Sequence, residues 1–244
     1  MTILQPFSSL TTRREALIAL AGLGVAGGAL AVSSRALAQS PVCVLTPEIS
    51  EGPFYFSYGG FREDVTDGKS GAAMRISFAV IDTTTCAAIP NALVDLWQCD
   101  AGGEYSGYSD AALVAATTGP VGPDGPPHRD PDTKTTYLRG TGVTNSNGGV
   151  RFKSIYPGWY DHRAVHAHVK VHVGGKVVHT GQIFFPDTIT DRVYQTAPYA
   201  LHTGNRVRNT DDKLFQRFGE SSTFALDTKD DVITASAILG LRRL

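Results

Sequence analysis

The sequence predicts an all-β fold, an antiparallel two-sheet β-sandwich with long loops. Three observations favour this class. Short segments of alternating apolar and polar residues dominate the chain, helical periodicity is scarce, and 26 glycines and 13 prolines among 244 residues supply many turns. The 42% apolar content is ordinary for a globular domain, and we find no internal repeat.

The expected strands follow one another between residues 74 and 185. In the first strand Met74, Ile76, Phe78 and Val80 share one face. Further strands are expected at 92–99, 136–143, 150–155, 164–172 and 177–185, with turns at 82–85, 145–149 and 174–175. One short helix is expected at 189–196, and the proline-containing stretch 119–134 is expected to be a long surface loop.

The first 38 residues have the pattern of an export signal. Arg13-Arg14 precedes a weakly apolar run at 17–32, and the small-residue pattern Ala36-Leu37-Ala38 follows. We therefore expect a twin-arginine signal at 1–38 and one domain at 39–244, placed in the periplasm or outside the cell. Two alternatives are an uncleaved anchor and an ordinary secretion signal beside a chance arginine pair. The twin-arginine machinery exports folded proteins, which favours a bound metal or cofactor.

The net charge and the cysteines limit the possible binding partners and the possible disulfides. The 22 basic and 23 acidic residues give a net charge of −1, so nothing indicates a nucleic-acid partner or an anionic membrane. After removal of the signal, no segment is expected to span a membrane stably. We expect no bridge between Cys86 and Cys99 within one hairpin, because the strand between them separates their Cα atoms too far; Cys43 could reach either one.

His166-Ala167-His168 is the first candidate for chemistry. The two histidines lie on an expected strand, where alternate residues share a face, so both imidazoles could bind one ion. A His-x-His pattern alone is a weak signal, since most strand histidines bind no metal.

The surrounding motifs resemble the intradiol ring-cleavage dioxygenases, the catechol and protocatechuate dioxygenase family. The match runs in order over most of 46–185. The export signal, and a mature start with little room for a helical region, resemble the exported single-domain branch of the family. Its segments include Asn91-Ala92-Leu93-Val94-Asp95-Leu96-Trp97, Gly102-Gly103-Glu104-Tyr105, Leu138-Arg139-Gly140, Pro157-Gly158-Trp159-Tyr160 and Thr180-Gly181-Gln182. Ser50, where the family often has Thr, and the stretch after Val114 depart from the pattern.

The resemblance implies a non-haem Fe(III) ion held by Tyr105, Tyr160, His166 and His168. Phenolate oxygen is a hard anionic donor suited to Fe(III). It also implies that catechol and O2 are the substrates, that Tyr160 leaves the iron and takes a substrate proton, and that the product is a muconate-type diacid. Arg163 and Gln182 match the residues that stabilise charge on the ring.

Each assignment has an alternative. Tyr108 could replace Tyr105, Arg163 could pair with Asp161 or Asp187, and Gln182 could satisfy strand ends. Glu51 could orient the N-terminal segment near the site. His162, His172 and His179 are expected to face solvent or to be hydrogen-bonded.

Three functions remain open from the sequence. The first is an exported ferric dioxygenase of catechols, which the joint presence of four ligand positions and Arg163 favours. The second is an exported non-catalytic β-sandwich that keeps the fold or holds another metal. The third, a zinc or copper hydrolytic site that includes His162, leaves the two tyrosines unexplained. The sequence is compatible with an oligomer.

Overall fold

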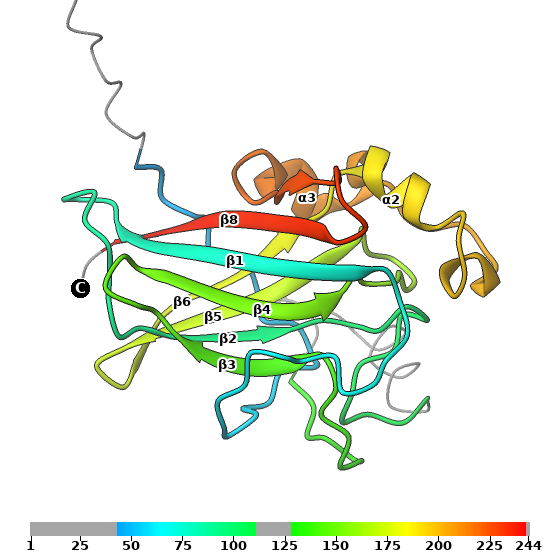
Figure 1. Ribbon diagram of the computed structural model, residues 1–244, viewed down its shortest axis with the longest axis horizontal. Helices are drawn as coiled ribbons and strands as arrows, with labels where there is room; N and C mark the ends of the chain where they lie inside the picture. The colour runs from blue at the N-terminus through cyan, green and yellow to red at the C-terminus, as the bar shows by residue number, and fades with distance from the viewer. Residues whose placement is uncertain (1–42, 111–127, 243–244) are drawn as a thin grey trace, which may run out of the picture. The chain divides into compact units, whose positions relative to one another are not determined.

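The computed structural model describes residues 43–110 and 128–242. In this part of the chain, two four-stranded sheets pack face to face (Figure 1). Their strand orders are β4-β1-β8-β7 and β3-β2-β5-β6. The signal expected at 1–38, and the part of the long loop before residue 128, lie outside the described residues. No helix among those described is long and apolar enough to cross a membrane.

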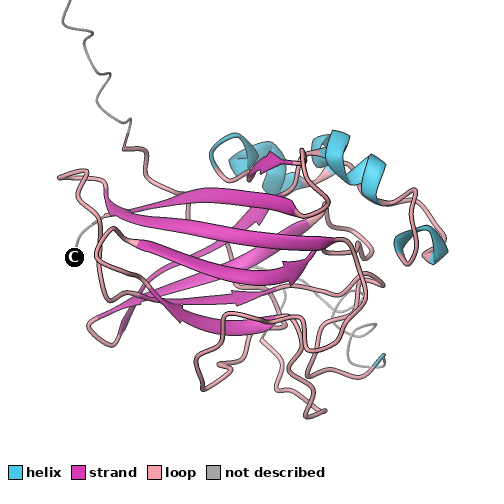
Figure 2. Cartoon of the chain, viewed as in Figure 1, coloured by secondary structure: helices cyan, strands magenta, loops and turns pink. Residues whose placement is uncertain are grey.

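The strands and helices fall in three groups. The first sheet contains β1 (Ala73–Asp82), β4 (Gly149–Ile155), β7 (Ala225–Asp227) and β8 (Ile233–Leu241). The second contains β2 (Leu93–Trp97), β3 (Arg139–Val143), β5 (His166–Val173) and β6 (Lys176–Phe184). Most helical residues lie between β6 and β7 in the sequence, in α2 (Asp187–Val193), α3 (Lys213–Phe218) and the 3-10 turns η2 (Tyr199–Leu201), η3 (Asn209–Asp211) and η4 (Gly219–Ser221). Figure 2 draws the helices in cyan beside the magenta strands.

The predicted all-β sandwich is confirmed, with two differences in detail. β1 pairs with β8 in parallel, so the first sheet is mixed rather than fully antiparallel. β7, β8 and α3 were not expected, although β8 buries alternate residues such as Ile233 and Ala235. Pairing of β1 with a strand some 150 residues later leaves no local sequence signal.

The core lies between the sheets. Met74, Ile76, Phe78 and Val80 of β1 are buried, as their alternation predicts. They pack in one apolar cluster with inward residues of the second sheet, which include Val94, Leu96, Val169 and Val171. The inward residues of both sheets thus form the core. The outward residues of the second sheet are not needed for this core and can form a site.

The outer face of the second sheet is covered by residues 43–58, which we call the strap. The strap is tied to β8 by the Thr46 backbone N–H, which donates to Gly240 O at 2.8 Å, and to β6 by the Ile49 N–H, which donates to Thr180 O at 3.0 Å. A Cys43–Cys86 disulfide fixes its beginning, whereas Cys99 is a buried thiol. The exclusion of a Cys86–Cys99 bridge is therefore confirmed.

Candidate metal centre

The two histidines enter the site from the start of β5. Directly opposite residues across the ladder share a face, so His168 lies beside Trp97 of β2 and Gln182 of β6. The rings of Trp97 and His168 stack with centroids 4.8 Å apart. Both histidines are about 2% exposed. The expected shared face is confirmed, and the strap buries it.

The two tyrosines come from loops that follow β2 and β4. The Gly158 N–H donates to Asp100 O at 2.8 Å, which ties the loops together. A Cβ at Gly158 would lie 2.5 Å from Ala101 O, and a Cβ at Gly103, whose φ is +88°, would lie 2.1 Å from Trp159 O. Glycine at these two positions therefore lets the loops approach closely enough to bring Tyr105 beside Tyr160.

Four donor atoms form a continuous cluster. Tyr160 Oη lies 3.0 Å from His166 Nε2, which lies 3.1 Å from His168 Nε2, which in turn lies 3.1 Å from Tyr105 Oη. His166 Nδ1 lies 2.6 Å from Ala164 O. Because a carbonyl can only accept, Nδ1 carries the proton, and the lone pair of His166 Nε2 faces the cluster.

Burial controls the electrostatics of the cluster. It lowers the pKa of His166 to about 3 and holds the pKa of His168 well below its ordinary value, so both imidazoles are neutral and able to ligate. Burial also raises the pKa of Tyr105, and raises that of Tyr160 to about 12 although Arg163 opposes it. The phenolates thus need a bound cation to form at neutral pH.

These residues fit a ferric ion. Neighbouring donor atoms lie 3.0–3.1 Å apart, close enough for one ion to bind them together. Two phenol oxygens with two imidazoles form a hard donor set suited to Fe(III). Among the described residues no group of three or more His, Cys, Asp or Glu side chains could hold a metal, so a metal at this cluster would need the tyrosine oxygens as ligands.

Arg163 and Gln182 lie together beside the cluster. Arg163 Nη2 donates to Gln182 Oε1 at 2.5 Å, and Gln182 Nε2 donates to Ser50 O of the strap at 2.7 Å. Arg163 Nε donates to Asp212 Oδ2 at 2.9 Å. Its carboxylate partner is thus Asp212 rather than Asp161 or Asp187, a contact across 49 residues with no pattern in the sequence.

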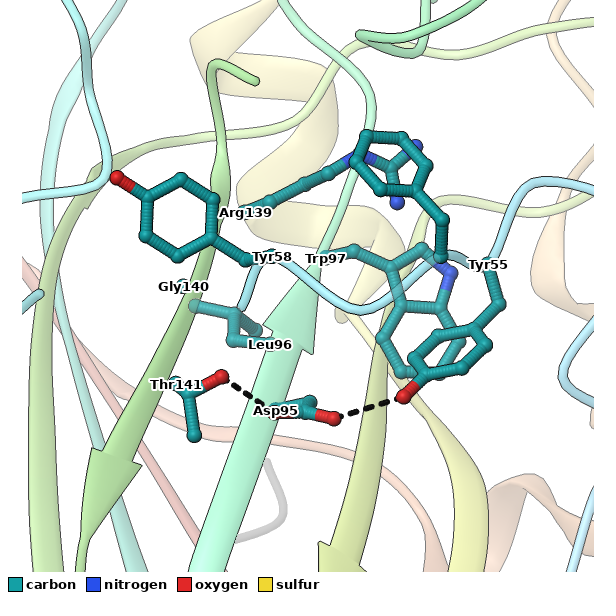
Figure 3. Close-up of a pocket in the computed structure, with 9 residues that line it drawn as sticks. Tyr55, Tyr58, Asp95, Leu96, Trp97, Arg139, Gly140 and Thr141 are labelled. Carbon is teal, nitrogen blue, oxygen red and sulfur yellow. Dashed lines mark hydrogen bonds between the residues drawn. The ribbon is translucent and has the colours of Figure 1, made fainter. Parts of the chain in front are cut away.

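The strap adds a second polar layer next to the site. Glu51 forms an ion pair with the buried Lys170, which agrees with a role of Glu51 in orienting the strap. Figure 3 shows Tyr55 over Trp97 with its hydroxyl turned to Asp95, to which it donates at 2.9 Å. The cavity drawn there has about 10 Å³, room for one water molecule and too little for an aromatic ring.

Several alternatives are settled by these positions. Tyr108 donates to Arg129 O at 3.0 Å and is not part of the donor cluster. His162 is exposed, which removes it from a three-histidine site. His172 bonds Asp95 as expected. The expectation for His179 is wrong: it is 2% exposed and its Nε2 has no hydrogen-bond partner, because it faces inward opposite Val171.

Comparison with known proteins gives structural relatives. No family model matches the sequence. No curated protein matches it either. An intradiol ring-cleavage dioxygenase from Tetranychus urticae is 30% identical, with a TM-score of 0.74 over 83% of this chain and 96% of that chain.

The chain belongs to the intradiol ring-cleavage dioxygenase family.

More distant members share the fold. The dioxygenase domain of a dioxygenase carbohydrate-binding protein fusion from Streptomyces sp. SirexAA-E is 23% identical, with a TM-score of 0.58 over 82% of this chain and all of that chain. Catechol 1,2-dioxygenase from Pseudomonas arvilla C-1 is 19% identical, with a TM-score of 0.53 over 81% of this chain and 62% of that chain. Family membership makes this protein an oxidoreductase of the dioxygenase type.

Proposed function

We propose that the protein is a non-haem Fe(III) dioxygenase that cleaves catechols between the two hydroxyl-bearing carbons with O2. The observation that carries this proposal is the cluster of Tyr105, Tyr160, His166 and His168 donor atoms, spaced 3.0–3.1 Å apart in a buried site. The product is a muconate-type diacid that contains both oxygen atoms.

The four residues of the cluster would hold the iron. His166 and His168 would bind it through Nε2, since their low pKa values keep them unprotonated through the physiological range. Tyr105 and Tyr160 would bind it as phenolates. When bound, Fe(III) supplies the positive charge that stabilises these phenolates and a dianionic catechol.

We assign proton transfer to Tyr160 and charge stabilisation to Arg163 and Gln182. Tyr160 Oη would accept a proton as the catechol enters, since the neutral phenol is the favoured form of this buried side chain when no cation is bound to it. Arg163 lowers the pKa values of Tyr160, His166 and His168, so its charge acts within the cluster. We assign Arg163 and Gln182 to stabilising negative charge that develops on the ring.

Oxygen uptake tests the reaction. Iron-loaded protein is mixed with catechol and a panel of substituted catechols, and O2 consumption is measured beside the diacid product. The expected result is one O2 consumed for each catechol cleaved. Iron-loaded protein that consumes no O2 with any catechol would instead support the non-catalytic sandwich.

We further propose that the protein acts outside the cytoplasm after export by the twin-arginine machinery. Arg13-Arg14 and the apolar run after it support this placement. Export as a folded chain would allow iron to be inserted before translocation.

A further inference from the structure

Asp212 accepts four hydrogen bonds, which is about the full acceptor capacity of a carboxylate. Its Oδ2 accepts from Arg163 Nε at 2.9 Å and from the Ala164 backbone N–H at 2.8 Å. Its Oδ1 accepts from the N–H groups of Leu214 and Phe215, at 2.7 and 3.1 Å, and caps α3. The side chain is 1% exposed, so water does not compete for these bonds.

The bonds on Oδ2 lead to two parts of the site. Ala164, whose N–H is held by Asp212, accepts the Nδ1 proton of the His166 ligand at 2.6 Å. Arg163, held by the same oxygen, donates onward to Gln182 at 2.5 Å. One carboxylate oxygen therefore connects the backbone that orients an iron ligand with the arginine beside the reaction.

Packing fixes the position of Asp212 itself. α3 lies against β6 and the strap through Leu214, Phe215 and Phe218, which contact an apolar cluster of Ile49, Ala164 and Phe184. The Phe184 ring lies between Phe215 and His166, with centroids 5.2 and 6.0 Å away. The helix that Asp212 caps therefore packs on Phe184, the β6 residue whose ring also lies near His166.

We propose that Asp212 is a positioning residue for the dioxygenase reaction, holding the Arg163 guanidinium and the Ala164–His166 segment as one rigid unit. The expected effect on turnover rests on the proposed function, but the Arg163–Asp212 contact does not depend on bound iron or substrate. Arg163 is about 21% exposed at its side chain, and without a fixed partner a long arginine side chain samples many rotamers. Misplacement by about 1 Å can cost a reaction about 10²-fold.

A helix cap alone would be a simpler role, and the two oxygens allow the roles to be separated. Asp212→Ser keeps a good N-cap acceptor for Leu214 and Phe215, but it removes the oxygen that binds Arg163 and Ala164. Asp211→Asn is the matched control, since Asp211 is the exposed neighbour. Arg163→Ala and the double variant Asp212→Ser/Arg163→Ala complete a cycle.

The first readout is turnover at matched iron content. We expect Asp212→Ser to lower kcat at least 10-fold and Asp211→Asn to leave kcat unchanged. The double variant should lose less than the product of the two single losses, because the two residues share one contact. An unchanged kcat in Asp212→Ser, or a double-variant loss equal to that product, would overturn the proposal.

The second readout needs neither iron nor turnover. In a ¹H–¹⁵N NMR spectrum of the metal-free protein, Arg163 Nε–H, assigned by its loss in Arg163→Ala, should exchange slowly in the wild type and Asp211→Asn. It should exchange rapidly in Asp212→Ser. If the wild type shows no dioxygenase turnover, the proposed function fails, yet slow Arg163 exchange abolished by Asp212→Ser still supports the anchor. Equal exchange in the two proteins overturns it.

Discussion

At the scale of single residues, the site depends on donors that are useful only when a cation joins them. The lone pairs of His166 and His168 are directed at the same small volume as two phenol oxygens. Without a metal, their mutual approach offers few compensating hydrogen bonds; His168 Nδ1 is itself without a partner. If the proposed function holds, each of these residues contributes more to metal binding than to folding.

Removing either histidine should abolish iron binding. His166→Ala and His168→Ala each delete one of four protein ligands, so we expect less than one tenth of the wild-type iron content, measured by elemental analysis after dialysis. Gel filtration and far-UV circular dichroism check that the fold is kept. Full iron content in both variants would place the metal elsewhere.

Replacement of Tyr160 should separate binding from turnover. Tyr160→Phe removes the ligand that is expected to leave the iron when the catechol enters, so, unlike the histidine variants, it should keep weaker but measurable iron binding. We also expect a shifted tyrosinate-to-iron absorption band and a kcat lowered by about 10²–10⁴-fold, because a proton acceptor is lost. Tyr108→Phe is the control, because Tyr108 lies outside the donor cluster. Bleaching by Tyr108→Phe and not by Tyr160→Phe would reverse the tyrosine assignment.

His179 should contribute to the loss of stability in acid. Burial lowers its pKa to about 4 in the folded protein, against about 6.5 when unfolded. Between these values the unfolded chain binds a proton that the folded chain does not, so the free energy of unfolding falls as pH falls from 6.5 to 4. The contribution is up to about 3 kcal/mol.

Urea unfolding at several pH values checks this in wild type and His179→Gln. The variant should show the shallower decline, because all other titrating groups are shared. Parallel curves would mean that His179 titrates alike in the folded and unfolded states.

At the scale of elements, the sequence predicted the features that local periodicity encodes. Alternation in β5 placed His166 and His168 on one face, and the structure confirms this. Alternation could not show that the strap covers this face, nor that His179 is buried inward, since both depend on which element packs on top. Asp212 was missed for the same reason: its contact with Arg163 arises only when α3 packs on β6.

The disulfide that fixes the strap should stabilise the folded protein. It closes a loop across 43 residues, and loss of such a crosslink costs about 2–4 kcal/mol. We expect Cys43→Ser to lower the free energy of unfolding by this amount in urea. A reductant should lower the stability of the wild type and leave Cys43→Ser unchanged; sensitivity of the variant to reductant would point to another cause.

At the scale of the whole molecule, the sandwich is a support that brings distant segments to one end of the second sheet. The donors come from the loops after β2 and β4 and from the start of β5, while Arg163 is anchored from α3. The family resemblance predicted the donor set, but the mixed first sheet and the β1–β8 pairing required the complete fold. Long-range pairing of this kind has no short sequence pattern.

Export should depend on the arginine pair. Arg13-Arg14→Lys-Lys is expected to retain the protein in the cytoplasm, because the twin-arginine receptor reads these two residues. Cell fractionation with immunodetection measures the distribution. Normal export of the variant would indicate the general secretion route.

We infer that the buried cluster of Tyr105, Tyr160, His166 and His168 is the iron site of the protein. An X-ray structure of the iron-loaded protein, with anomalous scattering measured at the iron edge, tests it most directly. We predict one strong peak bonded to Tyr105 Oη, Tyr160 Oη, His166 Nε2 and His168 Nε2. A catalytically active crystal whose iron peak lies away from these four atoms would contradict the account.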